Sequence, residues 1–267
     1  MKDAYLWPYE CPTRHTAISD IIRRTSSNQT DVREVALTGL DLSSTKAVLD
    51  LGCGFGFMTE AVAPRICHDG HVVGVDACPA NSEPFVQRIA AAGRSARFVC
   101  ELIDARLDWP DKSFDLIVAS YALYFFPKVV PEIARLLAPN GVFLALTHTE
   151  ESCRDLLRIA GLRGPNSRLL TLVRAFSAEN ARALLAPWFG EIERFDYQNA
   201  LTFELAQRDD LVRYMEFKLP LLAPDSQPGS DLAAPLARAV RTSLARCGRV
   251  VLDKDDAAFR CRRPKCR

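Results

Sequence analysis

Three glycines after a short apolar segment form the clearest candidate ligand site in the sequence. Residues 48–51 are apolar except for Asp50, and Gly52, Gly54 and Gly56 follow directly. Glycine permits a sharp turn, and because it has no Cβ a ligand can lie against its backbone. A glycine-rich loop between a strand and a helix also fits a dinucleotide site, so the loop alone does not identify its ligand.

Acidic residues at the ends of successive predicted strands narrow the range of ligands that the glycine loop could bind. A dinucleotide fingerprint requires glycine at the position of Phe57. Asp50 stands two residues before the first glycine, and Asp76 ends the next apolar run, 20 residues after Gly56. An acid at that position can bind both ribose hydroxyls, and each charge-assisted hydrogen bond contributes about 1.5–3 kcal/mol. Asp104, after the third run, could accept from an adenine amino group. Each acid alone could be an ordinary turn residue, but the three together favour a binding site.

Apolar runs bounded by Gly, Asp or Pro alternate with helical stretches from residue 47 to residue 149. The predicted strands are almost continuously apolar, as in a sheet that helices cover on both faces. Strand–helix alternation implies right-handed crossovers, so we predict an α/β fold with a doubly wound, mostly parallel sheet and helical insertions. The strands are expected at 47–51, 71–75, 96–100, 114–119 and 142–147, and the helices at 57–63, 80–92 and 128–138.

The segments around this core complete the predicted domain organisation. Two short helices are expected at 12–26 and 31–40, one strand at 191–204, and a last strand from 249–253 and 257–262. The expected parts are an N-terminal helical segment (1–46), a cofactor-binding core (47–149), a helical lid (150–190), and the final strands of the sheet with a helical insertion at 206–246 (191–267).

The ordered series of glycine loop and strand-end acids over residues 47–148 resembles the class I S-adenosylmethionine-dependent methyltransferases, especially those that act on small molecules. The resemblance implies a Rossmann-like seven-stranded sheet and S-adenosyl-L-methionine as cofactor, but it does not give the acceptor. By the same resemblance the cofactor loop is Asp50, Gly52, Cys53, Gly54 and Gly56, the ribose site is Asp76 with Ala77, the adenine site is Asp104 with Ala105, and Ala119, Ser120 and Tyr121 approach the methionine part.

The acceptor is expected outside the carboxyl ends of the fourth and fifth strands. His148 ends the fifth strand and is the candidate base if the acceptor must lose a proton; the alternative is that it only anchors the lid. Tyr121 and Tyr124, after the fourth strand, are candidates for orienting the acceptor. The lid begins directly after His148, and its arginines could bind a carboxylate or simply form a solvated helix face. Three aromatic residues could close the other side of the site or pack in the core, namely Tyr5, Trp7 and Tyr9.

Composition excludes several other classes of protein. A chain of 267 residues with 48% apolar and 25% charged residues is neither disordered nor fibrous, and a net charge of +1 gives no overall attraction to nucleic acid or to anionic membranes. No apolar run reaches the ~18 residues of a membrane helix, and no signal peptide is visible. We therefore expect a cytoplasmic protein, monomer or homodimer, with nine reduced cysteines and no metal site. The expected partner is a small-molecule acceptor, and neither nucleic acid nor a membrane is expected.

Three functions are compatible with this pattern. The first is methyl transfer to a small molecule. The second is an S-adenosylmethionine-binding enzyme of non-methylating chemistry, such as a cyclisation or a decarboxylation. The third is a protein that holds the cofactor without turnover and acts through a partner surface. Transfer of a deuterated methyl group to a product distinguishes the first function from the other two.

Overall fold

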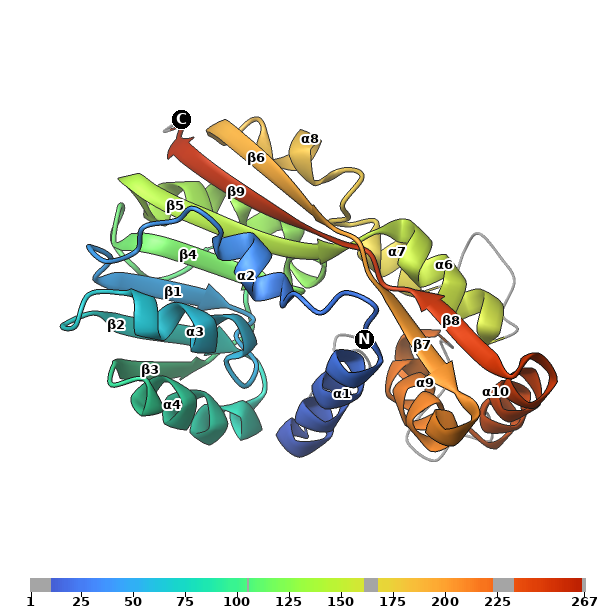
Figure 1. Cartoon of the computed structure of the whole chain (residues 1–267). Coiled ribbons are helices and arrows are strands. Elements are labelled where there is room, and N and C mark those ends of the chain that lie inside the picture. Colours follow the sequence, from blue (N-terminus) through green and yellow to red (C-terminus); the bar gives the residue numbers. More distant parts are fainter. Residues whose placement is uncertain (1–10, 105, 161–167, 223–232, 266–267) are drawn as a thin grey trace. The chain divides into compact units, whose positions relative to one another are not determined.

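The computed structural model describes residues 11–104, 106–160, 168–222 and 233–265. The chain divides into two compact units, each assembled from separate stretches of sequence (Figure 1). The unit boundaries fall at residues 29, 147, 174, 197 and 255 rather than at the expected 46, 149 and 190, because contacts in space and not chain order define a unit. The first unit comprises Met1–Gln29, His148–Arg174 and Gln198–Asp255, and the second comprises Thr30–Thr147, Ala175–Tyr197 and Asp256–Arg267.

The second unit is built around the predicted seven-stranded sheet, whose strand order is β3-β2-β1-β4-β5-β9-β6 (Figure 1). β1 pairs in parallel with β2 and β4, β2 with β3, and β4 with β5, whereas β6 and β9 are antiparallel. The predicted doubly wound, mostly parallel sheet is thereby confirmed. Its strands are β1 (Ala47–Leu51), β2 (His71–Asp76), β3 (Ser95–Cys100), β4 (Phe114–Ser120), β5 (Leu137–His148), β6 (Phe189–Tyr197) and β9 (Asp256–Pro264).

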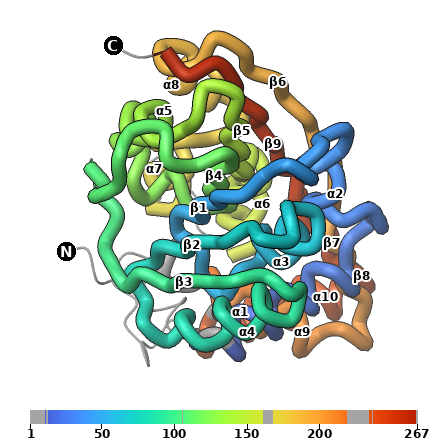
Figure 2. Tube along the Cα trace, turned by 90° about the vertical axis from the view of Figure 1, so that its left-hand side faces the viewer, coloured from blue at the N-terminus to red at the C-terminus, as the bar shows by residue number. Residues whose placement is uncertain are grey.

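Helices cover both faces of this sheet, which is why its central strands are so apolar. Leu49 in β1, Ile117 in β4 and Leu144 in β5 are all fully buried. α2 and α3 lie over one face and α5 over the other (Figure 2). Because the strands are parallel, the carboxyl ends of β1, β2 and β4 meet at one edge of the sheet, where the predicted site residues stand. The helices of this unit are α2 (Val32–Leu37), α3 (Phe57–Val62), α4 (Ser82–Ala91), α5 (Val130–Leu136) and α8 (Ala181–Leu185).

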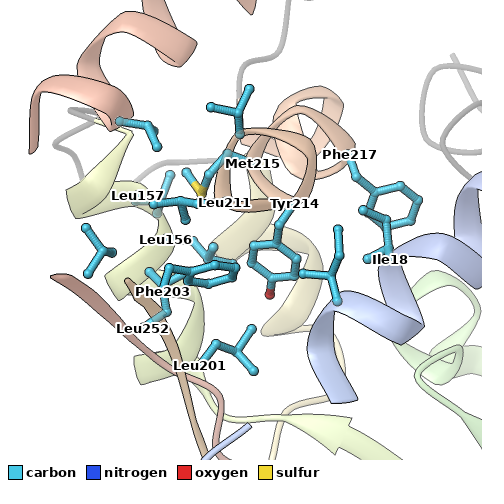
Figure 3. Packing of buried hydrophobic residues seen from close by; sticks show 14 of the residues in the cluster. Ile18, Leu156, Leu157, Leu201, Phe203, Leu211, Tyr214, Met215, Phe217 and Leu252 are labelled. Carbon is cyan, nitrogen blue, oxygen red and sulfur yellow. The ribbon is translucent and has the colours of Figure 1, made fainter. Parts of the chain in front are cut away.

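The first unit has its own core, formed by helices packed on a two-stranded antiparallel sheet of β7 and β8. Its centre is a cluster of fully buried side chains that includes Phe203 from β7, Leu211 and Tyr214 from α9, and Leu252 from β8 (Figure 3). The core therefore unites segments that are far apart in the sequence. The elements are α1 (Pro12–Thr25), α6 (Glu150–Ile159), α7 (Arg168–Val173), α9 (Arg208–Leu222), α10 (Ala233–Cys247), β7 (Ala200–Glu204) and β8 (Arg249–Asp253).

Two strand predictions are wrong in their partners. The alternating stretch 191–204 is not one strand but two, since β6 belongs to the large sheet and β7 pairs with β8. Residues 249–253 therefore do not extend the seven-stranded sheet. The chain is redirected at Asn199, whose backbone N–H donates to Asp255 Oδ1 at 2.7 Å and whose side-chain Oδ1 accepts from the backbone N–H of Asn28 at 3.1 Å. Alternation indicates a strand with two different faces, but it does not indicate which strand will be its neighbour.

Candidate functional site

The glycine loop lies where the sequence predicts it, between the end of β1 and the start of α3. Gly52 has a φ of +68°, its N–H donates to the carbonyl of Val75 at 2.8 Å, and a Cβ there would lie 2.6 Å from Ala122 Cβ. Gly54 has a φ of +50°, but a Cβ there would meet nothing within 4 Å. The loop is therefore packed tightly against the segment after β4 at Gly52 and is open at Gly54, where a ligand has room.

The Asp76 carboxylate is fixed by three hydrogen bonds, one of which comes from this loop. The backbone N–H of Gly54 donates to Oδ2 at 2.9 Å, and Oδ1 accepts from the backbone N–H of Cys78 at 2.8 Å and from Asn81 Nδ2 at 3.2 Å. Each carboxylate oxygen has about two lone-pair sites, so Asp76 can still accept from a ligand hydroxyl. The acid at the tip of β2 is thus held in one orientation beside the open part of the loop.

Asp50 is a buried carboxylate with one unsatisfied oxygen. The residue is 1% exposed, and its Oδ2 accepts from Thr59 Oγ1 at 3.0 Å. Within the described part of the chain, Oδ1 has no hydrogen-bond partner. Burial raises the pKa of Asp50 from 3.8 to about 7; the Thr59 hydroxyl opposes this shift and the charge of Asp76 adds to it. A buried acceptor without a donor is costly, so a cationic or hydrogen-bond-donating ligand would relieve this cost.

The remaining predicted cofactor residues lie at the ends of β1 to β4. Cys53 is buried and its N–H donates to Val75 O at 3.1 Å, whereas Ala77 is half-buried. Ala119 is fully buried, and Ser120 is half-buried with its Oγ unpartnered among the described residues. Asp104 lies exposed in the segment after β3, and Ala105 lies outside the described residues. The structure thus brings the glycine loop and Asp76 into direct contact, while the assignments at Asp104 and Ala105 stay predictions.

Tyr121, the first residue after β4, has an unusual backbone and a buried partner. Its φ is +54°, a left-handed conformation that is uncommon outside glycine. Its N–H donates to Leu146 O at 2.9 Å, its hydroxyl donates to Asp256 Oδ2 at 2.8 Å, and its ring lies 6.4 Å from that of Phe57 at the start of α3. Burial raises the pKa of the Tyr121 phenol well above its usual range, and the Asp256 carboxylate adds to this effect. Tyr121 therefore keeps its proton at physiological pH.

The other acceptor-side predictions have different surroundings. Tyr124 is 5% exposed and its ring packs on Phe125, with ring centroids 4.8 Å apart, so most of its surface is used in packing. His148 is the half-buried last residue of β5 and belongs to the first unit, whereas Tyr121 and Tyr124 belong to the second. The base role of His148 and the orienting role of Tyr124 therefore stay predictions. The aromatic residues Tyr5, Trp7 and Tyr9 lie outside the described residues.

Three arginines of the predicted lid in the first unit, Arg154, Arg158 and Arg174, are bound to acids of the same unit. The helical lid expected at 150–190 is divided into α6 and α7 of this unit and α8 of the other. Arg154 contacts Glu150 and Glu151, Arg174 contacts Glu150, and Arg158 contacts Asp155. These contacts make the three arginines part of an ion-paired helix face.

Sequence reasoning missed three residues at the site. Thr59 lies nine residues after Asp50, and Asn81 lies five residues after Asp76. Both are polar residues directly downstream of a predicted site residue, so the local pattern contained a signal for them. Asp256 is 135 residues from Tyr121, and no local pattern connects the two.

In the described ranges, no group of three or more His, Cys, Asp or Glu side chains is arranged to hold a metal ion. Over the same part of the chain, no helix combines the length and apolar character needed to cross a bilayer.

Comparison with known proteins agrees with this geometry. Residues 48–141 match the family described as "Methyltransferase domain". Trans-aconitate 2-methyltransferase of Methylobacterium radiotolerans is 32% identical over 134 residues, 48% of this chain and 49% of that protein. The 23S rRNA (uracil(1939)-C(5))-methyltransferase RlmD of Klebsiella pneumoniae is 36% identical over 132 residues, 48% of this chain and 29% of that protein. The chain spans about half the length of the curated relatives it matches.

Among solved structures, the YcgJ protein of Bacillus subtilis superimposes with a TM-score of 0.56 at 19% identity, over 93% of this chain and 99% of that one. At this level of identity the likeness concerns the fold alone. The fold and the glycine loop define a Rossmann-like α/β protein, with a candidate ligand site at the carboxyl edge of its sheet. With the family match, residues 48–141 are similar to a methyltransferase domain, and the curated relatives named above are methyltransferases.

Proposed function

We propose that this protein is an enzyme that transfers a methyl group from S-adenosyl-L-methionine to a small molecule. The observation that carries the proposal is the Asp76 carboxylate, held beside the open face of the glycine loop by the N–H of Gly54. An acid fixed in this way suits a ligand with paired hydroxyl groups, as the ribose of the cofactor has.

The residues present also fit the charge of this cofactor. S-adenosyl-L-methionine carries a sulfonium and an ammonium group, and Asp50 has a buried oxygen that no described residue satisfies. Asp50 and Asp76 would hold the cofactor from the two strand ends, with Gly54 leaving room for it. Bound there, the cofactor supplies an activated methyl group with a neutral leaving group. The protein then contributes mainly by holding the acceptor in line with the methyl carbon.

The acceptor side rests on residues after β4 and β5. Tyr121 and Tyr124 orient the acceptor in this proposal. A separate part of the proposal is that His148 acts as base for an acceptor that is a hydroxyl or an activated carbon. The small-molecule class is supported by relatives such as the trans-aconitate 2-methyltransferase and by a net charge of only +1, although the similar RlmD acts on rRNA. A cytoplasmic location is part of the same proposal.

Two measurements test the proposed function. Calorimetry should detect binding of S-adenosyl-L-methionine, and the Asp76→Ala variant should bind it at least ~10-fold more weakly. Incubation of the protein with a metabolite extract and cofactor carrying a deuterated methyl group should yield a labelled product in the mass spectrum. Binding without any labelled product would favour the non-methylating enzyme or the interaction protein. Absence of binding would refute all three functions.

A further inference from the structure

Two phenylalanines flank the end of the glycine loop, and each has a guanidinium group over its ring. Phe55 lies inside the loop and is 3% exposed, and Phe57 begins α3 directly after Gly56. The Cζ atom of Arg88, on α4, lies 4.7 Å from the centroid of the Phe55 ring. The Cζ atom of Arg33, on α2, lies 4.8 Å from the centroid of the Phe57 ring. Because a guanidinium group at this distance is attracted to the face of a ring, α2 and α4 each hold one of the two phenylalanines.

A single carboxylate joins these two arginines. Glu60, on α3, accepts from Arg33 Nη1 at 2.9 Å through Oε2 and from Arg88 Nη1 at 2.8 Å through Oε1. Arg33 Nη1 also donates to the carbonyl of Phe57 at 3.0 Å, and Asp31 accepts from Nε and Nη2 of the same guanidinium group. The two arginine side chains are only 21% and 27% exposed, so solvent and salt screen their ion pairs less than those of fully exposed side chains. Three helices are thus cross-linked through Glu60.

The backbone of the glycine loop is intrinsically flexible. Gly52, Gly54 and Gly56 have φ values of +68°, +50° and +89°. Glycine loses more backbone freedom on folding than any other residue, so an ordered loop with three glycines carries an entropic cost. The N–H of Gly54 is bound to Asp76. Beyond that point, Arg88 Cδ lies 3.8 Å from the position that a Cβ of Gly56 would occupy, so the arginine packs directly on the end of the loop.

We propose that Glu60 is a positioning residue that keeps the glycine loop in its binding conformation before the cofactor arrives. With Arg33 and Arg88 it forms a clamp on the two phenylalanine rings. This inference rests on the proposed function, since the loop is there the binding site of S-adenosyl-L-methionine. A loop that is ordered in advance loses less conformational entropy on binding, so the clamp raises the affinity without any contact between Glu60 and the cofactor.

A second ion pair in the same unit provides a matched control. Glu34, on α2, accepts from Arg65 Nη2 at 2.9 Å and 2.7 Å through its two carboxylate oxygens. Glu34 and Glu60 both lie in the first turn of a six-residue helix, and their side chains are 53% and 44% exposed. Arg65 Nη1 donates to the carbonyl of Ala61, a residue of α3 and not of the glycine loop. Removal of either carboxylate therefore takes away a comparable ion pair and the same first-turn charge, but only Glu60 acts on the loop.

The test compares variants of the full chain at the two pairs. Glu60→Ala and Arg88→Met disable the clamp, and Glu34→Ala and Arg65→Met are their controls; methionine keeps an apolar stem but removes the charge. Amide hydrogen exchange over residues 52–57 is measured without any ligand. Calorimetric titration with S-adenosyl-L-methionine then gives the Kd of each variant at about 0.05 M and about 1 M NaCl.

Glu60→Ala and Arg88→Met should each raise the Kd at least about threefold at the lower salt concentration, and loop amides of the unliganded variants should exchange faster than those of wild type. At the higher salt concentration the ratio of variant to wild-type Kd should fall, because salt screens the ion pairs of the wild type. The double variant should bind about as weakly as the weaker single variant, since both changes disable one unit. In turnover with an acceptor from the labelled extract, the KM for the cofactor should rise and kcat should stay within about twofold of wild type. Both control variants should match wild type in Kd and in loop exchange.

Any of three results would overturn the inference: a smaller rise in Kd than about threefold, unchanged exchange of the unliganded loop, or an equal loss of affinity in the control variants. If Glu60→Ala does not fold, Arg88→Met against Arg65→Met decides the role of the clamp. A wild-type protein that does not bind S-adenosyl-L-methionine refutes the proposed function and this inference together. A wild type that binds it, with clamp variants that bind equally well, refutes this inference alone.

Discussion

Asp50 carries a stability cost that replacement by asparagine should remove. Burial raises the pKa of its carboxyl from 3.8 to about 7, so the folded protein holds this proton more tightly than the unfolded chain does. When folding raises the pKa of a group, its contribution to stability is fully present below the pKa of the unfolded state. That contribution is lost as the pH rises through the pKa of the folded state. The wild type therefore loses stability at this group between about pH 4 and pH 7, and the loss is complete above pH 7.

The magnitude follows from the size of the shift. About 3 pKa units at 1.36 kcal/mol each correspond to about 4 kcal/mol at pH 8. This value is an upper limit, because the amide of Asp50→Asn must still accept from Thr59 Oγ1. The part of the shift between pH 5 and pH 7 is about two units, so the advantage of the variant should grow by up to about 3 kcal/mol between pH 5 and pH 8.

Urea denaturation of wild type and Asp50→Asn at pH 5 and pH 8 measures this difference, and other titrations cancel between the two proteins. Asp108→Asn is the control, since Asp108 is exposed. The reasoning is refuted if Asp50→Asn is less stable than wild type at pH 8, or if its advantage does not grow with pH. The same variant should bind S-adenosyl-L-methionine at least ~10-fold more weakly, because the neutral amide no longer attracts a cationic ligand. A single carboxylate would then lower stability and support binding.

The remaining predictions concern the loop, the lid and the candidate base. Gly54→Ala and Gly93→Ala should each lower the free energy of unfolding by about 1–2 kcal/mol in urea denaturation, because both glycines have positive φ and open space. Only Gly54→Ala should also lower the affinity for the cofactor in calorimetry. Equal affinities of the two variants would show that the cofactor does not bind at the glycine loop. Amide hydrogen exchange in α6 and α7 should slow when S-adenosylhomocysteine and acceptor are both bound, and unchanged exchange would exclude a lid. His148→Gln should reduce turnover more than twofold at some pH between about 6 and 9 if His148 is the base. A smaller effect throughout that range means that positioning alone suffices.

The order of strands and helices in the core could be predicted because each one is encoded locally. The apolar runs that became β1, β2 and β4 are short, and their boundaries are marked by Gly, Asp or Pro. Parallel strands with intervening helices place their carboxyl ends at one edge, so the positions of Asp50 and Asp76 near the glycine loop also followed from the pattern. The contact between Gly54 and Asp76 agrees with that reasoning.

The partners of the later strands could not be predicted in the same way. The periodicity of 191–204 is the same whether the strand joins one sheet or passes between two, and the deciding contacts are those of Asn199 with Asn28 and Asp255, which are distant in sequence. The first unit depends on such contacts throughout, since its core joins α1, α6, β7, α9 and β8.

The sequence by itself predicted a candidate ligand-binding edge: a glycine loop, an acid two residues before it and an acid at the next strand end. These features depend on the few residues around each turn, so they can be recognised in the sequence without a structure. Only the tertiary structure decided that one Asp50 oxygen has no partner among the described residues, that Asp76 accepts from Gly54, and that Tyr121 gives its hydrogen to Asp256. Burial and hydrogen-bond direction depend on atoms that the folded chain brings together from distant positions, and 135 residues separate the last pair.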